Sequence, residues 1–273
     1  MINPRQANLE PLPEVLGAEL PSTFRGTLSG YLAVRRTIGC SVAAVFQLTA
    51  PQQPPLFLKI EEEGNFAELP DEAARIRWLA SQNIQCPVIL DFARHDGRWW
   101  LLTTALVGRD LASSPNLSPK LVIDIAAAAL RDLHSAGLGA CPFDHRLGSS
   151  ITEARRRIEA GAVCEDQFEA KWEGYTAEAL FDELVAQAPV SEDLVIAHGD
   201  PCLPNLMSDG RVFTGFVDCG KLGVSDRHRD LALVARSIRS NIGRDYVTPC
   251  FERYGLQPDP DKLAFYTLLD EFF

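Results

Sequence analysis

The polar residues between positions 198 and 218 combine carboxylate and amide groups at a spacing that suits a divalent metal. The segment HGDPCLPN spans 198–205, and Asp218 follows Asn205 by thirteen residues, in the segment VDCG. The dipeptide Asp209-Gly210, between the strand-like segments NLMS and RVFTGFVD, is a hairpin signal. A hairpin folds Asp218 back beside Asp200 and Asn205. Hard oxygen ligands of this kind suit Mg²⁺, which keeps its other positions for water and phosphate oxygens.

These residues match the parts that phosphoryl transfer requires, namely alignment, charge neutralisation and a group that orients the attacking hydroxyl. Kinases supply them through H-R-D-x-x-x-x-N followed by D-F-G. This chain reads H-G-D-x-x-x-x-N and then D-C-G. We therefore predict Asp200 as the catalytic group and Asn205 and Asp218 as the metal ligands. A polar loop beside a purely structural hairpin is the alternative.

A lysine and a glutamate upstream complete the pattern. Lys59 lies in the apolar strand-like segment LFLKI, where a buried ammonium group is costly unless it is paired. Glu72 is the expected partner, since it shares one face of a predicted helix over 70–83 with Ile76, Leu79 and Ala80. The pattern then predicts that Lys59 contacts the α- and β-phosphates of a nucleotide. A lone lysine near a strand end and a solvated glutamate remain the alternative.

Other candidate nucleotide contacts depend on position more than on residue type. The segment TIGCSVAAVF, 37–46, joins two strand-like segments as a phosphate-covering loop does, and Ser41 with nearby backbone N–H groups suits a phosphate. Only Gly39 stands where kinases carry three glycines, so a plain hairpin is an open alternative. Thr104 and Leu106 lie where a linker presents backbone groups to adenine.

The predicted secondary structure that positions these residues differs between the two parts of the chain. The first hundred residues are rich in strands, with the helix over 70–83 among them; the strand segments are 35–48, 54–63 and a pair over 86–106 with Asp96-Gly97 at its turn. From Gly108 onward helices dominate. Ser118-Pro119 opens one of them, and Gly137 is expected to end it. Segregated strands and helices predict an α+β protein with a sheet lobe plus one helix, 1–107, and a mainly helical lobe, 108–273.

Composition limits the possible partners. Lys and Arg number 26 against 37 Asp and Glu, a net charge of −11, which disfavours nucleic acid and anionic membranes and suits a cationic ligand, although solubility alone also explains it. No apolar run of membrane-spanning length and no secretory signal is found. The seven cysteines are odd in number and form no C-x-x-C pair, which indicates reduced thiols in a cytosolic enzyme. We expect the protein to be a monomer or weak dimer.

The motifs together resemble the aminoglycoside 3'-phosphotransferases, bacterial antibiotic-resistance enzymes with a bilobal protein-kinase-like fold. The matching segments are TIGCS, LKI, DEAARI, CPFDHRL, HGDPCLPN, GFVDCGKLGVSDRHRDLAL and LLDEFF. The resemblance implies transfer of the γ-phosphoryl group of ATP or GTP to the 3'-hydroxyl of kanamycin- or neomycin-type drugs, with Mg²⁺. It gives Asp200, Asn205, Asp218, Lys59 and Glu72 the roles stated above. His198 and Asp230 are expected to brace the Asp200 loop.

The resemblance also implies an acidic drug pocket. Its expected members are Asp166, Glu169, Arg236, Asp270, Glu271 and the carboxylate of Phe273. Lys171, Ser240 and Asn241 stand where relatives can be acidic, which leaves the drug range open. Lys221 replaces a usual arginine and supplies a point charge rather than a fork.

Three alternatives stay open at this level. One is a kinase of the same fold for streptomycin, a macrolide, choline or homoserine. A pseudokinase that binds without turnover is disfavoured because all five catalytic positions are filled. A protein kinase is disfavoured because GKLGVSDRHRD leaves no room for an activation loop after Asp218.

Overall fold

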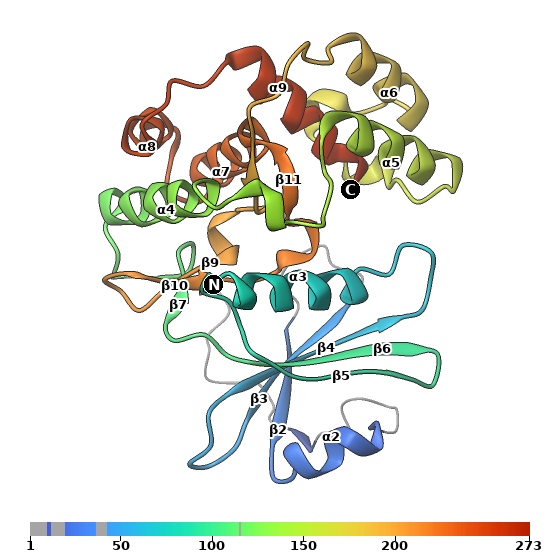
Figure 1. Cartoon of the computed structure of the whole chain (residues 1–273), viewed down its shortest axis with the longest axis vertical. Coiled ribbons are helices and arrows are strands. Elements are labelled where there is room, and N and C mark those ends of the chain that lie inside the picture. The colour runs from blue at the N-terminus through green and yellow to red at the C-terminus, as the bar shows by residue number, and fades with distance from the viewer. Residues whose placement is uncertain (1–9, 12–19, 37–42, 115) are drawn as a thin grey trace. The chain divides into compact units, whose positions relative to one another are not determined.

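The computed structural model describes residues 10–11, 20–36, 43–114 and 116–273. The chain divides into two compact units, Met1–Val107 and Gly108–Phe273. Figure 1 labels the elements of each. The α+β class predicted from the sequence is confirmed, with an antiparallel sheet in the N-terminal unit and mostly helices in the C-terminal unit.

The N-terminal unit is a six-stranded antiparallel sheet with the order β1-β2-β3-β4-β6-β5. The strands are β1 (Glu10–Pro11), β2 (Leu32–Arg36), β3 (Ala44–Thr49), β4 (Leu56–Glu62), β5 (Ile89–His95) and β6 (Arg98–Thr104). Asp96 and Gly97, which join β5 to β6, both have positive φ, as the predicted two-residue turn requires.

Side chains alternate along β4 and so define the two faces of this sheet. Leu56, Leu58 and Ile60 belong to a buried cluster on one face, together with Phe24 and Trp100. Lys59, between them in sequence, points to the other face, where α3 (Leu69–Ser81) packs against β4, β5 and β6. One face of β4 therefore packs into the apolar core, while the other face presents Lys59 to α3.

The expectation of a single helix in this unit was wrong. A short second helix, α2 (Ser22–Thr27), lies on the opposite face of the sheet from α3 (Figure 1). Its Phe24 is fully buried and meets Trp100 edge to face, with ring centroids 6.3 Å apart. Burial of this aromatic side chain stabilises α2, although the helix propensity of its sequence, STFRGT, is low. Of the residues predicted to share one face of α3, Glu72, Ile76 and Leu79 are buried, whereas Ala80 is exposed.

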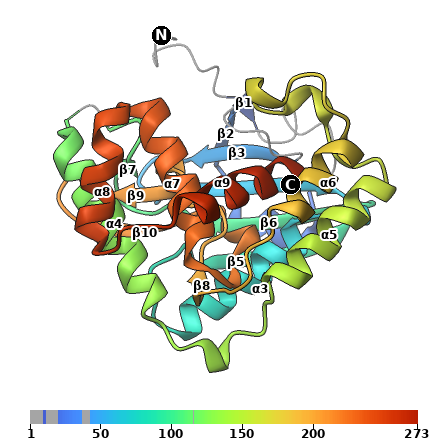
Figure 2. The same ribbon diagram turned by 90° about the horizontal axis from the view of Figure 1, so that it is seen from above.

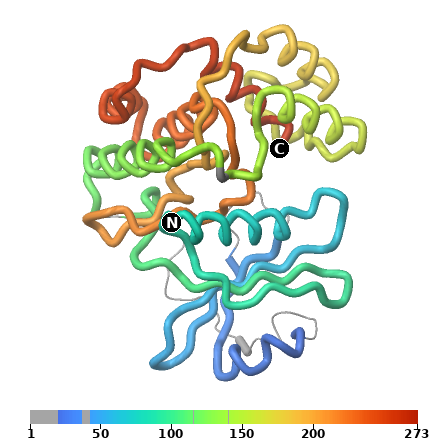
Figure 3. The backbone as a smooth tube through the Cα atoms, in the orientation of Figure 1, coloured from blue at the N-terminus to red at the C-terminus, as the bar shows by residue number. Residues whose placement is uncertain are grey.

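In its described residues, 108–114 and 116–273, the C-terminal unit has six α-helices and two small sheets. The helices are α4 (Pro119–His134), α5 (Leu147–Glu159), α6 (Ala177–Ala186), α7 (Arg227–Asn241), α8 (Val247–Tyr254) and α9 (Pro260–Leu269). One sheet has the order β10-β9-β7, from β7 (Arg109–Asp110), β9 (Leu206–Ser208) and β10 (Phe213–Phe216); the other pairs β8 (Leu194–Ala197) with β11 (Gly223–Asp226). Figure 3 traces the chain through these elements, and Figure 2 shows α9 lying along α7.

Helix α4 begins as predicted and ends earlier than predicted. The Ser118 hydroxyl accepts a hydrogen bond from Leu121 N–H, and Pro119 is the first helical residue. Gly137 does not end the helix. The helix ends at His134, and its C-cap residue Ser135 is still right-handed, with its N–H bonded to Arg131 O, so this end is not closed by a left-handed glycine.

Two broader expectations have structural counterparts. Within the described residues, no helix is long and apolar enough to cross a bilayer.

The six cysteines in the described part of the chain are free thiols. Burial and the charge of Asp200 raise the pKa of Cys202 well above its usual value, which disfavours a nucleophilic thiolate at this position.

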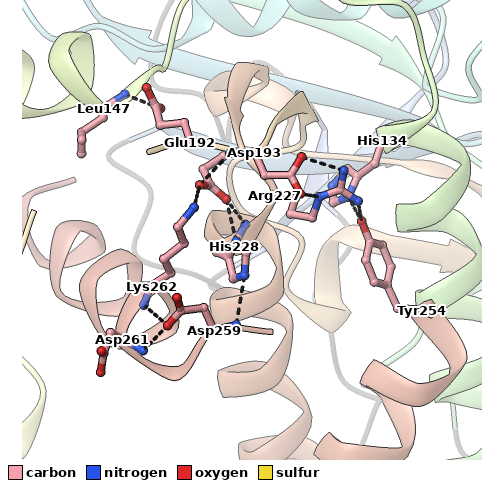
Figure 4. Close-up of polar contacts among 11 residues, drawn as sticks. His134, Leu147, Glu192, Asp193, Arg227, His228, Tyr254, Asp259, Asp261 and Lys262 are labelled. Carbon is pink, nitrogen blue, oxygen red and sulfur yellow. Dashed lines mark hydrogen bonds and ion pairs between the residues drawn. The ribbon is translucent and has the colours of Figure 1, made fainter. Parts of the chain in front are cut away.

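Asp226, the residue that caps α7, is the centre of a buried polar cluster. Figure 4 labels its partners Asp193, His228 and Lys262. Its Oδ1 accepts from the backbone N–H of His228 at 2.9 Å and from the His228 ring at 2.7 Å. Its Oδ2 accepts from Lys262 Nζ at 2.8 Å and from Asp193 N–H at 3.0 Å. Burial alone raises the pKa of this carboxyl, but the hydrogen bonds from His228, Lys262 and Asp193 outweigh burial and hold the pKa far below its usual value.

We predict that Asp226→Asn lowers the free energy of unfolding at pH 7 by about 3 kcal/mol, because it leaves buried donors facing an amide. The folded pKa of Asp226 lies below the unfolded value of about 3.9. The difference between wild type and variant is therefore fully present above about pH 4 and shrinks as the pH falls further.

Urea titrations of both proteins at several pH values measure this difference. Asp261→Asn is the matched control, since Asp261 is exposed in the first turn of nearby α9 and contributes at most about 1 kcal/mol through the helix dipole. Equal losses in the two variants contradict the role assigned to Asp226.

Candidate active site

The loop that carries Asp200 is held by one buried carboxylate. Asp230, in the first turn of α7, accepts hydrogen bonds from His198 N–H at 2.7 Å and from Gly199 N–H at 2.9 Å. Asp230 is fully buried, which on its own raises its pKa, but the hydrogen bonds from His134 and from these N–H groups hold the pKa below its usual value. The predicted brace by His198 and Asp230 is thus confirmed.

The His198 ring joins this loop to the strand that leads to Asp218. Its Nδ1 accepts from Asp200 N–H at 3.3 Å, and its Nε2 lies 3.2 Å from Val217 O. The ring therefore carries its proton on Nε2 and donates it to Val217. Val217 N–H in turn donates to Asn205 O at 3.0 Å. The hairpin of β9 and β10, predicted from Asp209-Gly210, is present and brings residue 217 beside residue 205.

The two loops also touch at Gly199. This residue has a φ of +86°, and a Cβ atom there would lie 2.1 Å from Lys221 O. Only glycine meets both conditions, the left-handed backbone and the close backbone approach. The glycine of the H-G-D motif therefore sets the distance between the Asp200 loop and the segment Cys219–Lys221, which forms the 3-10 turn after Asp218.

Asp200 and Asn205 are in direct contact. The Asn205 side-chain nitrogen donates to Asp200 O at 2.9 Å and to Asp200 Oδ2 at 3.0 Å. Since the amide nitrogen is used on Asp200, the amide oxygen is the atom left for a metal ion. Asp218 has a left-handed backbone conformation, with φ 58° and ψ 51°. Such strain in a non-glycine residue is commonly found at functional sites.

These residues fit a magnesium ion by donor chemistry. An amide oxygen and a carboxylate are the hard ligands that Mg²⁺ prefers, with phosphate oxygens and water completing the shell. Among the described residues, no group of three or more His, Cys, Asp or Glu side chains is arranged to hold a metal ion. The predicted ligands are one amide, Asn205, and one carboxylate, Asp218. Most of the remaining ligands of the ion would therefore come from the nucleotide phosphates and water rather than from further carboxylates of the protein.

The lysine and glutamate predicted in the N-terminal unit form an ion pair. Lys59 Nζ lies 2.7 Å and 2.8 Å from the two Glu72 carboxylate oxygens. Glu72 is buried and Lys59 half-buried. Glu61, which the sequence analysis missed, holds the start of α3 by accepting from the N–H groups of Glu68 and Leu69 at 2.8 and 2.9 Å. A carboxylate at a helix start fixes the helix that carries Glu72, and the run EEE after LKI was the available signal.

The other predicted nucleotide contacts are less defined by the structure. Thr104 N–H donates to Val88 O at 2.9 Å, and the Thr104 hydroxyl accepts from Val88 N–H at 3.0 Å, so both groups are already engaged. Leu106 is half-buried, two residues past the end of β6. Ser41 lies outside the described residues.

Three carboxylates predicted for substrate binding, Glu169, Asp270 and Glu271, gather around the guanidinium group of Arg236, a fourth predicted contact, in the C-terminal unit. Arg236 forms a short ion pair with Asp270, and its Nη1 lies 3.6 Å from Glu169 Oε1. Glu271 Oε2 accepts from Glu169 N–H at 3.0 Å. Burial acts to raise the pKa of Asp270, but Lys221 and Arg236 hold it below its usual value. Burial raises the pKa of Glu271, which lies beside the other carboxylates.

The remaining predicted contacts lie apart from this cluster or modify it. Asp166 is exposed in the 3-10 turn Glu165–Gln167. Lys171 Nζ is 3.1 Å from Glu169 Oε2 and so offsets part of its charge. The Phe273 backbone oxygen lies 3.5 Å from Lys221 Nζ.

Ser240 and Asn241, at the α7 positions where we expected that relatives can be acidic, make hydrogen bonds within their own helix. The Ser240 hydroxyl donates to Arg236 O at 3.1 Å, and the Asn241 amide donates to Ser237 O at 2.8 Å. They add no charge beside Arg236.

Comparison with known proteins places the chain in a family. A model of the phosphotransferase enzyme family matches residues 35–266. The chain belongs to this family. It is 39% identical to an aminoglycoside 3'-phosphotransferase of Streptomyces fradiae, over 86% of this chain and 92% of that protein. The resemblance predicted from the motifs is therefore confirmed.

Solved structures of phosphotransferases agree with the fold. An aminoglycoside-3'-phosphotransferase of type VIII superposes with a TM-score of 0.83 at 33% identity, covering 92% of this chain and 96% of that one. An aminoglycoside phosphotransferase of Streptomyces rimosus, in complex with ADP and streptomycin, gives a TM-score of 0.76 at 27% identity, over 92% and 96% of the two chains. The predicted kinase-like α+β fold is thus confirmed.

We predict that Gly199→Ala lowers the free energy of unfolding by about 3 kcal/mol or more, because the new methyl group overlaps the Lys221 backbone. Gly210→Ala is the matched control. Gly210 also has a positive φ, but a Cβ atom there meets nothing within 4 Å, so only the conformational cost of about 1 kcal/mol applies. Urea unfolding of both variants measures the difference, and equal losses argue against a close contact between the two loops.

Proposed function

We propose that the protein transfers the γ-phosphoryl group of ATP or GTP to the 3'-hydroxyl of a kanamycin- or neomycin-type aminoglycoside and so confers resistance to the drug. The relative from Streptomyces fradiae and the type VIII structure, both 3'-phosphotransferases that align over most of this chain, support this function. The observation that carries it is the Asp200–Asn205 contact within a loop pinned by Asp230. We expect the reaction to occur in the cytosol, with the protein as a monomer or weak dimer.

Each residue of the loop has a distinct proposed role. Asp200 orients the drug hydroxyl and accepts its proton, and the Asn205 amide, by donating to Asp200 Oδ2, fixes the rotamer of that carboxylate. Asn205 and Asp218 hold Mg²⁺, which neutralises phosphate charge when bound. These roles require little covalent chemistry, because phosphoryl transfer depends mainly on alignment and electrostatics.

On the nucleotide side, Glu72 holds the Lys59 ammonium group in one orientation. A preformed ion pair lowers the entropy lost when the lysine meets the α- and β-phosphates. Leu106 and Thr104 are the proposed adenine contacts, and Ser41 the proposed phosphate contact.

The cluster around Arg236 is the proposed drug site. Glu169, Asp270 and Glu271 supply negative charge for ammonium groups, with Asp166 and the Phe273 carboxylate at the edge of the site. Arg236 holds Asp270 and Glu169 in place rather than contacting a cationic drug directly.

Phosphorylation of streptomycin is the second candidate, because a structural neighbour at 27% identity was solved with ADP and streptomycin. That drug presents a different hydroxyl, so the two functions predict different products.

A substrate panel with ATP, GTP and Mg²⁺ tests the proposed function. We expect kanamycin and neomycin to gain one phosphoryl group by mass, and an analogue without the 3'-hydroxyl to gain none at that ring. Streptomycin, choline and homoserine complete the panel. Phosphorylation of streptomycin alone supports the second candidate, and no product from any aminoglycoside overturns both.

We predict that Asp200→Ala lowers kcat by more than the factor of about 10²–10⁴ expected for loss of a general base, since it also removes positioning of the hydroxyl. Steady-state kinetics measure the loss, and calorimetric titration with nucleotide should still show binding. Asp182→Ala, at an exposed site on α6, controls for removal of a carboxylate. A near-normal rate in Asp200→Ala rules out the assigned role.

A further inference from the structure

A chain of buried hydrogen bonds connects α8 to the loop that carries Asp200. Tyr254 ends α8, and its hydroxyl lies 2.7 Å from Nδ1 of His134, the last residue of α4. His134 Nε2 lies 3.0 Å from Asp230 Oδ2. The same carboxylate accepts the N–H groups of His198 and Gly199. Residues from four distant segments therefore converge on the two positions that precede Asp200.

The contacts fix the direction of donation along this chain. The ionised Asp230 carboxylate can only accept, so the His134 nitrogen that faces it carries a proton. In the neutral ring, Nδ1 then accepts from the Tyr254 hydroxyl, and Arg227 Nη1 donates to the Tyr254 oxygen at 3.1 Å (Figure 4). Each donor in the chain thus points toward Asp230, as cooperative hydrogen bonding favours.

Burial makes each link costly to lose. The His134 side chain is 2% exposed and that of Asp230 is 0% exposed. Without its donor, a buried acceptor loses both the hydrogen bond and its former hydration. The outer end of the chain borders a cavity of ≈ 260 Å³, lined in part by His134, Arg227 and Tyr254. The chain therefore starts near solvent and ends at the loop.

We propose that Tyr254 and His134 are positioning residues that hold the Asp200 loop in its working geometry through Asp230. This inference rests on the proposed role of Asp200 in phosphoryl transfer. Tyr254 fixes the orientation of the His134 ring, and the ring fixes the carboxylate that accepts the two N–H groups before Asp200. Misplacement of a reacting group by about 1 Å, caused by a mutation far from the chemistry, costs up to about 10²-fold in rate.

The kinetic test compares Tyr254→Phe, His134→Leu and His134→Gln. We expect kcat to fall about tenfold in Tyr254→Phe and about 10–100-fold in His134→Leu, while KM for nucleotide and drug stays unchanged. His134→Gln should recover at least several-fold over His134→Leu, because its amide can donate to Asp230. A merely structural role gives no such rescue.

Tyr266→Phe is the matched control. Tyr266 is also buried in the C-terminal unit, but its hydroxyl has no hydrogen-bond partner within the part of the chain that the structure describes. Its kcat should stay within about twofold of wild type. An equal loss in Tyr266→Phe and Tyr254→Phe overturns the proposal, as does a rise in KM without loss of kcat.

Hydrogen exchange provides a readout that does not need turnover. Deuterium uptake at His198 and Gly199 should quicken at least tenfold in Tyr254→Phe and in His134→Leu, but not in Tyr266→Phe. Unchanged deuterium uptake at His198 and Gly199 in both variants contradicts the proposal that Tyr254 and His134 hold the loop. If wild type phosphorylates no compound in the panel, the proposed function fails while exchange still decides whether Tyr254 and His134 hold the loop. If Tyr254→Phe does not fold, the comparison of His134→Gln with His134→Leu decides alone.

Discussion

The ionised carboxylate of Asp230 is the interaction on which the candidate active site depends. A charge with no solvent contact is stable only when donors surround it, and here two of the donors are backbone N–H groups of residues 198 and 199. The loop before Asp200 cannot move without leaving that charge unsatisfied. The same hydrogen bonds therefore both satisfy the buried anion and fix the Asp200 loop.

Helix α7 meets the same requirement twice within its first turn. Asp226 caps the helix and Asp230 follows four residues later, so both anions lie at the end where the helix dipole is positive. Asp226 fixes the elements around α9 and residue 193, while Asp230 fixes the Asp200 loop. Arg229, between them, is buried, and burial lowers the pKa of its guanidinium group. The start of α7 thus brings together the buried charges of Asp226, Arg229 and Asp230. Such charges are stable in the interior only when opposite charges and hydrogen bonds compensate them.

The sequence predicted those features that arise from local pattern. The Asp209-Gly210 hairpin, the Asp96-Gly97 turn and the Ser118-Pro119 helix start depend on neighbouring residues, and all three are present. The Lys59–Glu72 pair was also predictable, because an apolar strand that carries one lysine demands a partner. Helix α2 was not predicted, since Phe24 packs against Trp100, a contact far apart in the sequence. The end of α4 was placed too late, because Gly137 does not form its C-cap.

Long-range polar contacts were the least predictable part of the site. Nothing in the spacing of His134, Asp230 and Tyr254 indicates that they meet, because each ends or begins a different helix. Single histidines and tyrosines occur too often for a pattern to mark them. The kinase motif pointed to the candidate catalytic residues and to the brace by Asp230, whereas His134 and Tyr254, which contact Asp230 and His134 in turn, were visible only in three dimensions.

The charges around Arg236 show why a net charge of −11 says little about selectivity. Glu169 and Asp270 already contact basic side chains of this chain, namely Lys171 and Arg236. The overall charge draws a cationic substrate toward the protein at long range. At contact, an ammonium group must improve on an ion pair that exists without it, and desolvating that pair has a cost. At the drug site proposed around Arg236, discrimination between drugs would therefore depend on which internal ion pairs each drug can replace, and Lys171 offsets part of the charge of Glu169 there.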